Sequence, residues 1–345
     1  LVAHETHEGL RLANALWDQS PTPTLAAPRV EALVATGQVE RARAVALETL
    51  ERPPRPDQLA LWVAYAKACL DIDKGTREAL EAVDSARTAL GHSGPIILRL
   101  IETRAHFEAG DTADAITCAQ QVSSTPQKHE ELNDWLTLQG LHAQALHAEG
   151  ATDDALRLLE TIPTSLGSTL PARGVVDGML GRLLWHAGRP RDAAQRLETA
   201  ARNPSMSVLN RARTLNNAAL ACYQVGDRPG ALAKWEDAIA HFERLRANLD
   251  MLRVAINLSV GYRELERPDR ARKHGLWAVE QADRIGHHEL HTVAMGNLGD
   301  VHFLEGDGEA AQHCYARAHE LALAHNLTLD VAESARRLAR LAIER

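Results

Sequence analysis

The sequence predicts an all-α protein in which helix pairs stack into an α-solenoid. Ala contributes 58 of the 345 residues, whereas aromatic residues make up only 4%. Ala has the best helix propensity and a minimal side chain, so this composition favours helices packed at close distance. β-Sandwiches and barrels are disfavoured because they require β-branched and aromatic residues. The second observation is a repeat that runs the length of the chain.

The repeat is a Gly at a turn followed five residues later by an Ala. The Ala recurs eight times, at positions 42, 79, 115, 155, 193, 231, 271 and 311. The turn Gly is present in six copies, as Gly37, Gly110, Gly150, Gly188, Gly226 and Gly306, and Glu266 takes its place in another. The regular spacing of the eight alanines along the chain indicates a repeat architecture rather than a series of unrelated domains.

Each copy predicts two helices. The first ends at the Gly, which adopts the left-handed conformation cheaply, and the second begins two or three residues later. Pro190, Pro229 and Pro268 lie where a proline in the first helical turn loses no hydrogen bond. The small Ala allows the second helix to approach the first. A single pair cannot bury its apolar face alone, so about eight pairs must stack.

Further helices are expected at both ends of the array, over about 2–17 and 327–343. The last one carries Arg336, Arg337 and Arg340 and is expected to cap the end with a polar face. The length alone would allow two or three domains. The repeat instead predicts one solenoid over 1–345, with degenerate copies in 1–171, well-formed copies in 172–326 and a capping helix in 327–345.

The chain resembles tetratricopeptide-repeat (TPR) proteins, whose helix pairs carry small and aromatic residues at set positions. The best copy supplies Leu298, Gly299, Gly306, Ala311, Tyr315 and Ala318. The resemblance implies a right-handed solenoid with the first helices on its concave side. The repeat is longer than a standard TPR and is similar to the sensor regions of MalT-type bacterial regulators and to kinesin light-chain repeats.

Composition and motifs argue against several functions. The net charge of −8 disfavours broad binding to nucleic acid or to an anionic membrane. Phosphate-binding loops, nucleophile elbows and zinc-protease motifs are missing from the sequence, so we expect no enzyme, no cofactor and no metal. The four cysteines lie far apart and are expected to be free thiols in a cytoplasmic protein.

Asn217, Asn257 and Asn297 recur at steps of 40 residues, at the same position of three first helices. An amide offers both a donor and an acceptor, which suits the backbone of an extended peptide. The resemblance implies that this position faces the groove, as in kinesin light chains, whose asparagines hold cargo peptides. Other candidate ligand residues on these faces are Arg213, Arg253, Tyr223, Arg263 and Asp300. An arginine fork there would hold a carboxylate or phosphate.

A structural role is the alternative for the same asparagines, because Asn at this position also helps to hold TPR helix pairs together. The leading functional hypothesis is a non-catalytic module that binds a peptide or protein segment, an acidic one if the arginines are used. Because the chain begins with Leu1 rather than Met, we expect it to be part of a larger bacterial regulatory protein, whose other domains are further possible partners. A self-contained scaffold or peptide receptor is the second hypothesis, and an enzyme is the remote third.

Overall fold

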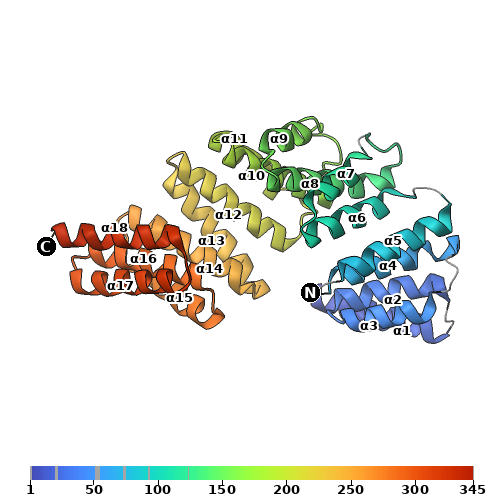
Figure 1. The fold of residues 1–345 in the computed structure, drawn as a ribbon, viewed down its shortest axis with the longest axis horizontal. Coiled ribbons are helices and arrows are strands. Elements are labelled where there is room, and N and C mark those ends of the chain that lie inside the picture. Colours follow the sequence, from blue (N-terminus) through green and yellow to red (C-terminus); the bar gives the residue numbers. More distant parts are fainter. Residues whose placement is uncertain are drawn as a thin grey trace. The chain divides into compact units, whose positions relative to one another are not determined.

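The computed structural model describes residues 2–19, 22–50, 55–72, 75–91, 94–122 and 124–344, and within these ranges every regular element is a helix (Figure 1). The α-helices are α1 (Val2–Gln19), α2 (Pro23–Ala35), α3 (Val39–Thr49), α4 (Leu59–Leu70), α5 (Thr76–Leu90), α6 (Ile96–Ala109), α7 (Thr112–Gln120), α8 (Leu132–Ala148), α9 (Thr152–Glu160), α10 (Pro171–His186), α11 (Pro190–Ala201), α12 (Val208–Gln224), α13 (Arg228–Leu245), α14 (Asn248–Glu264), α15 (Pro268–Ile285), α16 (His288–Leu304), α17 (Gly308–Ala324) and α18 (Thr328–Glu344). Two 3-10 turns, Pro56–Gln58 and His129–Glu131, precede α4 and α8. The predicted all-α class is confirmed.

The predicted helix pairs are present as eight consecutive hairpins, from α2 and α3 through α16 and α17. The repeated Ala lies in the second helix of every hairpin, and all eight copies have no exposed surface. They are Ala42, Ala79, Ala115, Ala155, Ala193, Ala231, Ala271 and Ala311. A methyl group is the largest side chain that this position holds, because the backbones of the two helices approach there. The register inferred from the sequence is therefore confirmed.

Turn geometry follows the same repeat. The six predicted turn glycines all have positive φ angles, for example 80° at Gly306. Glu266 takes that conformation at the corresponding turn, with φ of 54°. A residue with a Cβ adopts it at a cost, which Gly avoids.

The described chain divides into two compact units, residues 1–179 and 180–345, and the boundary falls within α10. In the N-terminal unit, one apolar core runs from Leu10 to Ala105 and includes Leu61 and Trp62. In the C-terminal unit, Trp235 and its neighbours form the largest cluster. The expected single array over 1–345 stays a prediction.

Small residues on the first helices of the C-terminal unit create the space for the second helices. A Cβ on Gly299 would lie 2.5 Å from the ring of Tyr315, and one on Gly181 would lie 2.4 Å from Leu197. Neither distance is compatible with normal packing, so an α-carbon without a side chain is required at both positions. First helices also contact the next first helix, as α14 does with α16 and α16 with α18. These contacts align the side chains that form the candidate site.

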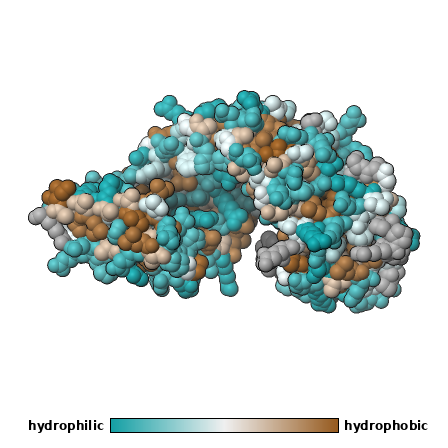
Figure 2. All heavy atoms as spheres, viewed as in Figure 1, coloured by the Kyte–Doolittle hydropathy of each residue, from teal (hydrophilic) through white to brown (hydrophobic). Residues whose placement is uncertain are grey.

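Helix α18 exists as predicted, but its faces differ from the expectation of a polar cap. Arg337 points inward and only 17% of its side chain is exposed. Leu329 and Ile343 are 86% and 85% exposed on the outside, and apolar residues gather at this end of the unit in Figure 2. The arginine turns inward because it has a buried polar partner on α16, Asn297.

Candidate functional site

The predicted ligand residues lie on three first helices of the C-terminal unit. Asn217 is on α12, Asn257 on α14 and Asn297 on α16. One further step of 40 residues leads to Arg337 on α18. The series therefore has four members that the structure describes, and the last of them was expected from the sequence on a capping face rather than among the ligand residues.

Asn257 joins two neighbouring repeats. Its Nδ2 donates to Oδ1 of Asn216 on α12 at 3.2 Å, and Nε1 of Trp235 donates to the same oxygen at 3.1 Å. Asn216 precedes the predicted Asn217, so the residue that accepts these bonds is the neighbour of the one that the pattern indicated. The bond from Trp235 satisfies an indole N–H that would otherwise be costly to bury.

Asn297 is 8% exposed and lies under α18. Its Oδ1 accepts a hydrogen bond from Nη2 of Arg337 at 3.3 Å. A Cβ on the preceding Gly296 would lie 2.1 Å from Nη1 of Arg337, so the guanidinium needs the space that this glycine leaves. In this position the amide carbonyl binds α18 of the same chain.

Two of the predicted arginines form ion pairs with the following first helix, in each case 37 residues along the chain. Nη2 of Arg213 lies 2.9 Å from Oδ2 of Asp250, and Nη1 of Arg263 lies 2.7 Å from Oδ2 of Asp300. The second pair is the better shielded, with 21% and 18% of the side chains exposed. Arg253 is exposed and makes no ion pair with any residue in the described ranges.

Tyr223 belongs to a third contact between repeats. Its hydroxyl donates to Glu264 on α14, and the guanidinium of Arg228 lies 4.5 Å from the centre of the tyrosine ring. Nε of Arg228 also donates to Glu264 at 2.7 Å. Burial, the hydrogen bond to Glu264 and the charge of that carboxylate raise the pKa of Tyr223 to about 12, so the hydroxyl is a donor at neutral pH.

Asn217 differs from the other two asparagines because its side chain forms no hydrogen bond with another described residue. It lines a small cavity of about 60 Å³, together with Arg182, Trp185, His186, Leu197 and Leu220. The indole nitrogen of Trp185 is also buried without a hydrogen-bond partner. The indoles of Trp62 and Trp135 share this feature, so the cavity beside its ring is what sets Trp185 apart.

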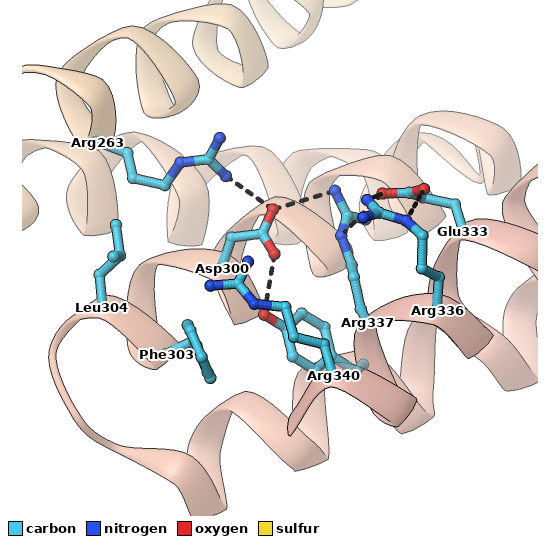
Figure 3. Close-up of a pocket in the computed structure, with 9 residues that line it drawn as sticks. Arg263, Asp300, Phe303, Leu304, Glu333, Arg336, Arg337 and Arg340 are labelled. Atoms are coloured by element: carbon cyan, nitrogen blue, oxygen red, sulfur yellow. Dashed lines mark hydrogen bonds and ion pairs between the residues drawn. The ribbon is translucent and has the colours of Figure 1, made fainter. Parts of the chain in front are cut away.

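A second cavity, of about 360 Å³, lies at the C-terminal end of the unit, and we refer to it as the arginine pocket (Figure 3). It is lined by Arg263, Asp300, Phe303, Leu304, Tyr315, Glu333, Arg336, Arg337 and Arg340. The guanidinium groups of Arg263 and Arg337 converge on Asp300, as Figure 3 shows, and Tyr315 donates to the second oxygen of this carboxylate at 2.9 Å. Two predicted residues, Arg263 and Asp300, thus meet in one pocket.

No protein-family profile matches the sequence, and no curated protein matches it significantly. Solved structures do match. A STAND (signal transduction ATPase with numerous domains) protein with a tetratricopeptide repeat sensor, from Pyrococcus horikoshii, is 12% identical with a TM-score of 0.61, covering 99% of this chain and 53% of that one. The chain has the tetratricopeptide-repeat fold. With 53% of the STAND protein covered, the present chain spans about half the length of that TPR protein.

Two further solved structures extend the comparison of the TPR fold. The apo form of the quorum sensor NprR from B. thuringiensis is 14% identical with a TM-score of 0.59, covering 92% of this chain and 87% of that one. A Rap protein in complex with Competence and Sporulation Factor is 13% identical with a TM-score of 0.52, covering 99% and 98%. At such identities the likeness establishes the fold alone.

Among the residues that the structure describes, no group of three His, Cys, Asp or Glu side chains is placed to hold a metal ion. No helix in those ranges is both long and apolar enough to cross a bilayer. All four cysteines are free and buried, and burial raises the pKa of Cys69, Cys118 and Cys314 to about 11. These thiols are neutral at pH 7 and are poor nucleophiles.

The candidate ligand residues chosen from the sequence did not include Asn216, Arg337 or Arg340, and the two arginines were expected only on a polar capping face. Arg337 could have been found by extending the 40-residue step past Asn297, because the step places it at the same position of the next helix. The sequence carries no comparable signal for Asn216. The rotation of the helices decides whether Asn216 or the adjacent Asn217 faces the next repeat.

Proposed function

We propose that this protein is a non-catalytic recognition module that binds a peptide or protein segment along the first helices of its C-terminal unit. One observation carries the proposal. Asn217 and Trp185 line the same small cavity, and neither the Asn217 amide nor the buried indole N–H of Trp185 forms a hydrogen bond with another residue in the described part of the chain. A backbone carbonyl of a bound segment would accept from such donors, and an apolar side chain would fill the space between Leu197 and Leu220.

The other predicted residues act as the frame of this site. Asn257, Asn297, Arg213 and Arg263 bind neighbouring repeats, which sets the spacing of the first helices. Arg253 occupies the same repeat position as Arg213, and its side chain remains available to a ligand. A cation in that place favours a segment that carries an acidic residue.

The functions named for structurally similar proteins support a sensor role. They include a tetratricopeptide repeat sensor within a larger ATPase, a quorum sensor and a Rap protein bound to Competence and Sporulation Factor. We therefore propose that the chain belongs to a larger regulatory protein whose output depends on what the solenoid binds. A sensor differs from a rigid scaffold because its ligand must prefer one spacing of the repeats over another.

The test begins with selection of peptides from a random library against the full chain. The Kd of a selected peptide is then measured by fluorescence anisotropy for the native chain and for Asn217→Ala. We expect the variant to bind at least tenfold more weakly, the equivalent of about one hydrogen bond in a desolvated site. Gln195→Ala is the control, because it removes an exposed amide from a second helix, α11.

Circular dichroism would establish that Asn217→Ala keeps its helicity. Unchanged affinity in a folded Asn217→Ala chain would overturn the proposal at this cavity. Arg253→Glu is measured beside it, and a selected acidic peptide should lose affinity through charge repulsion. A sensor role further requires that the bound peptide changes the hydrogen-exchange protection of backbone amides in α12 and α14, including amides that it does not contact. In a rigid scaffold, the protection of amides away from the peptide would stay unchanged.

A further inference from the structure

The arginine pocket contains more positive than negative charge. Four guanidinium groups and two carboxylates line it, and Glu344 adds a third carboxylate beside Arg340, at 3.1 Å. Among the residues that line the pocket the guanidinium groups outnumber the carboxylates, in a chain whose overall net charge is −8, while Asp330 and Glu264 act on Arg337 and Arg263 from outside the lining. Local positive charge that opposes the net charge of the molecule attracts an anion to this place.

The floor of the pocket is preorganised. Arg263 and Arg337 are only 21% and 17% exposed, and both are held by Oδ2 of Asp300, at 2.7 and 3.1 Å. The other oxygen of Asp300 accepts from the hydroxyl of Tyr315 at 2.9 Å. Groups fixed in this way lose little freedom when they bind a ligand.

The mouth of the pocket is formed by two exposed arginines of α18. The side chain of Arg336 is 69% exposed and pairs with Glu333, and that of Arg340 is 57% exposed and pairs with Glu344. Each partner lies one turn away on the same helix, and exposed pairs of this kind contribute little to stability. An incoming anion can therefore replace the carboxylate of Glu333 or Glu344 at little cost in free energy.

Arg340 is oriented by a contact that uses none of its N–H groups. Its guanidinium carbon lies 4.4 Å from the centre of the Phe303 ring. Stacking on an aromatic face fixes the plane of the guanidinium and leaves its edge free for two parallel hydrogen bonds to an oxyanion. Only Nε of Arg340 takes part in the pair with Glu344.

We infer that the arginine pocket binds an oxyanion, the carboxylate or phosphate group of an acidic peptide segment. Arg340 supplies the forked contact, Arg336 the second charge at the mouth, and Arg263 and Arg337 the positive floor behind them. The inference rests on the proposed function in so far as the anion is part of a bound segment. It names the ligand chemistry that the proposed function leaves open.

The experiment measures anisotropy of three dye-labelled hexapeptides with the full chain at constant ionic strength. One probe is rich in Glu, one contains phosphoserine, and one has Gln in place of Glu. We expect the two charged probes to bind and Arg340→Gln to weaken them at least tenfold, without effect on the Gln probe. Tighter binding of the phosphoserine probe, and its displacement by inorganic phosphate, would identify phosphate as the preferred group, and tighter binding of the Glu probe would identify carboxylate.

The control is Arg317→Gln on α17. Arg317 is 51% exposed and pairs with Glu320 one turn away, as Arg336 does with Glu333, but it lies outside the pocket. Equal losses in Arg317→Gln and Arg340→Gln would mean that only the general charge matters and would overturn the inference. Equal binding of the charged and Gln probes would overturn it as well.

A second variant tests the same site by a gain of affinity. Asp300→Asn removes the internal carboxylate that competes for Arg263 and Arg337, so the charged probes should bind at least threefold more tightly. Glu320→Gln, which removes a carboxylate from the exposed ion pair with Arg317 outside the pocket, should leave the binding of the charged probes unchanged. Weaker or unchanged binding in a folded Asp300→Asn chain contradicts the inference.

The two proposals fail separately. If a selected peptide depends on Asn217 but the charged probes do not depend on Arg340, the oxyanion site is wrong and the recognition module stands. If the charged probes depend on Arg340 but no selected peptide depends on Asn217, the oxyanion site stands and the cavity at Asn217 is wrong.

Discussion

Nδ2 of Asn257 donates to Oδ1 of Asn216 across 41 residues of sequence, and the same oxygen accepts from the indole of Trp235. One amide therefore ties together α12, α13 and α14. Its neighbour Asn217 forms no side-chain hydrogen bond with any other described residue. Adjacent asparagines on one helix thus have different roles, one within the frame and one at a cavity.

Asn216→Ala is expected to lower the free energy of unfolding by about 1–3 kcal/mol, because it leaves two donors without their acceptor. Asn217→Ala should change it by less than about 0.5 kcal/mol, as substitutions away from such networks do. Urea unfolding followed by circular dichroism measures both values. Equal stabilities of the two variants would show that the hydrogen bonds to Asn216 contribute nothing.

Gly299→Ala is expected to destabilise the protein by about 1–3 kcal/mol. The new methyl group would lie 2.5 Å from the Tyr315 ring, which overpacks the contact between α16 and α17. Gly9→Ala on α1 is the matched control, because no atom lies within 4 Å of the position of its Cβ. That variant should be stabilised by about 0.5–1 kcal/mol through helix propensity. Thermal unfolding of both variants tests the contrast, and a neutral Gly299→Ala would contradict it.

Asp177→Ala should be among the most damaging single substitutions in the N-terminal unit. Its carboxylate binds Arg173 through two hydrogen bonds, at 2.6 and 2.9 Å, and the side chains are only 9% and 3% exposed. Removal of one partner of a buried pair costs about 3–5 kcal/mol, because the other charge stays buried. Arg157→Ala, from an ion pair whose arginine is 74% exposed, should cost less than about 1 kcal/mol. A loss below 1 kcal/mol in Asp177→Ala, measured by urea unfolding, would count against this pair.

Glu102 predicts a specific acid sensitivity. Burial would raise the pKa of its carboxyl, but hydrogen bonds from Arg87 and Cys118, together with the charges of Arg87 and Arg99, lower it from 4.5 to about 2. A depressed pKa in the folded state stabilises the protein above pH 4.5, and this stabilisation is lost as the pH falls from 4.5 towards 2. The full contribution is about 3 kcal/mol at neutral pH.

Glu102→Gln should therefore be less stable at pH 7, and its stability should fall less steeply than that of the native chain between pH 4.5 and 2. Urea unfolding at a series of pH values gives both curves. Glu81→Gln is the control, because Glu81 is 64% exposed and lies outside the Glu102 cluster. Parallel curves for the native chain and Glu102→Gln would contradict the assignment.

Most of the fold was predictable because repeated small residues carry a strict steric meaning. The eight alanines mark the contact between the helices of each pair, and all of them are fully buried. The left-handed turns within the helix pairs were equally predictable, because a Gly marks the turn in six of the eight hairpins. The polar face of α18 was not predictable in this way, since Arg337 turns inward to a partner 40 residues away.

The candidate site was only partly predictable. A step of 40 residues places Asn217, Asn257 and Asn297 on equivalent helix positions, and the sequence gives no further information on their partners. It does not show that Asp250 and Asp300 neutralise Arg213 and Arg263, because each pair spans two repeats. Long polar side chains reach the next helix or solvent with little difference in intrinsic energy, so neighbouring helices decide between them.

The sequence by itself determined the helical class, the eight pairs and the register of their contacts, because each of these depends on residue size at a fixed interval. Only the tertiary structure decided which polar side chains join the repeats and which remain available to a ligand. The physical reason is that hydrogen bonds and ion pairs between repeats depend on the stagger and rotation of adjacent first helices. That geometry leaves Asn217 beside a small cavity and brings Arg263, Arg337 and Arg340 into one pocket.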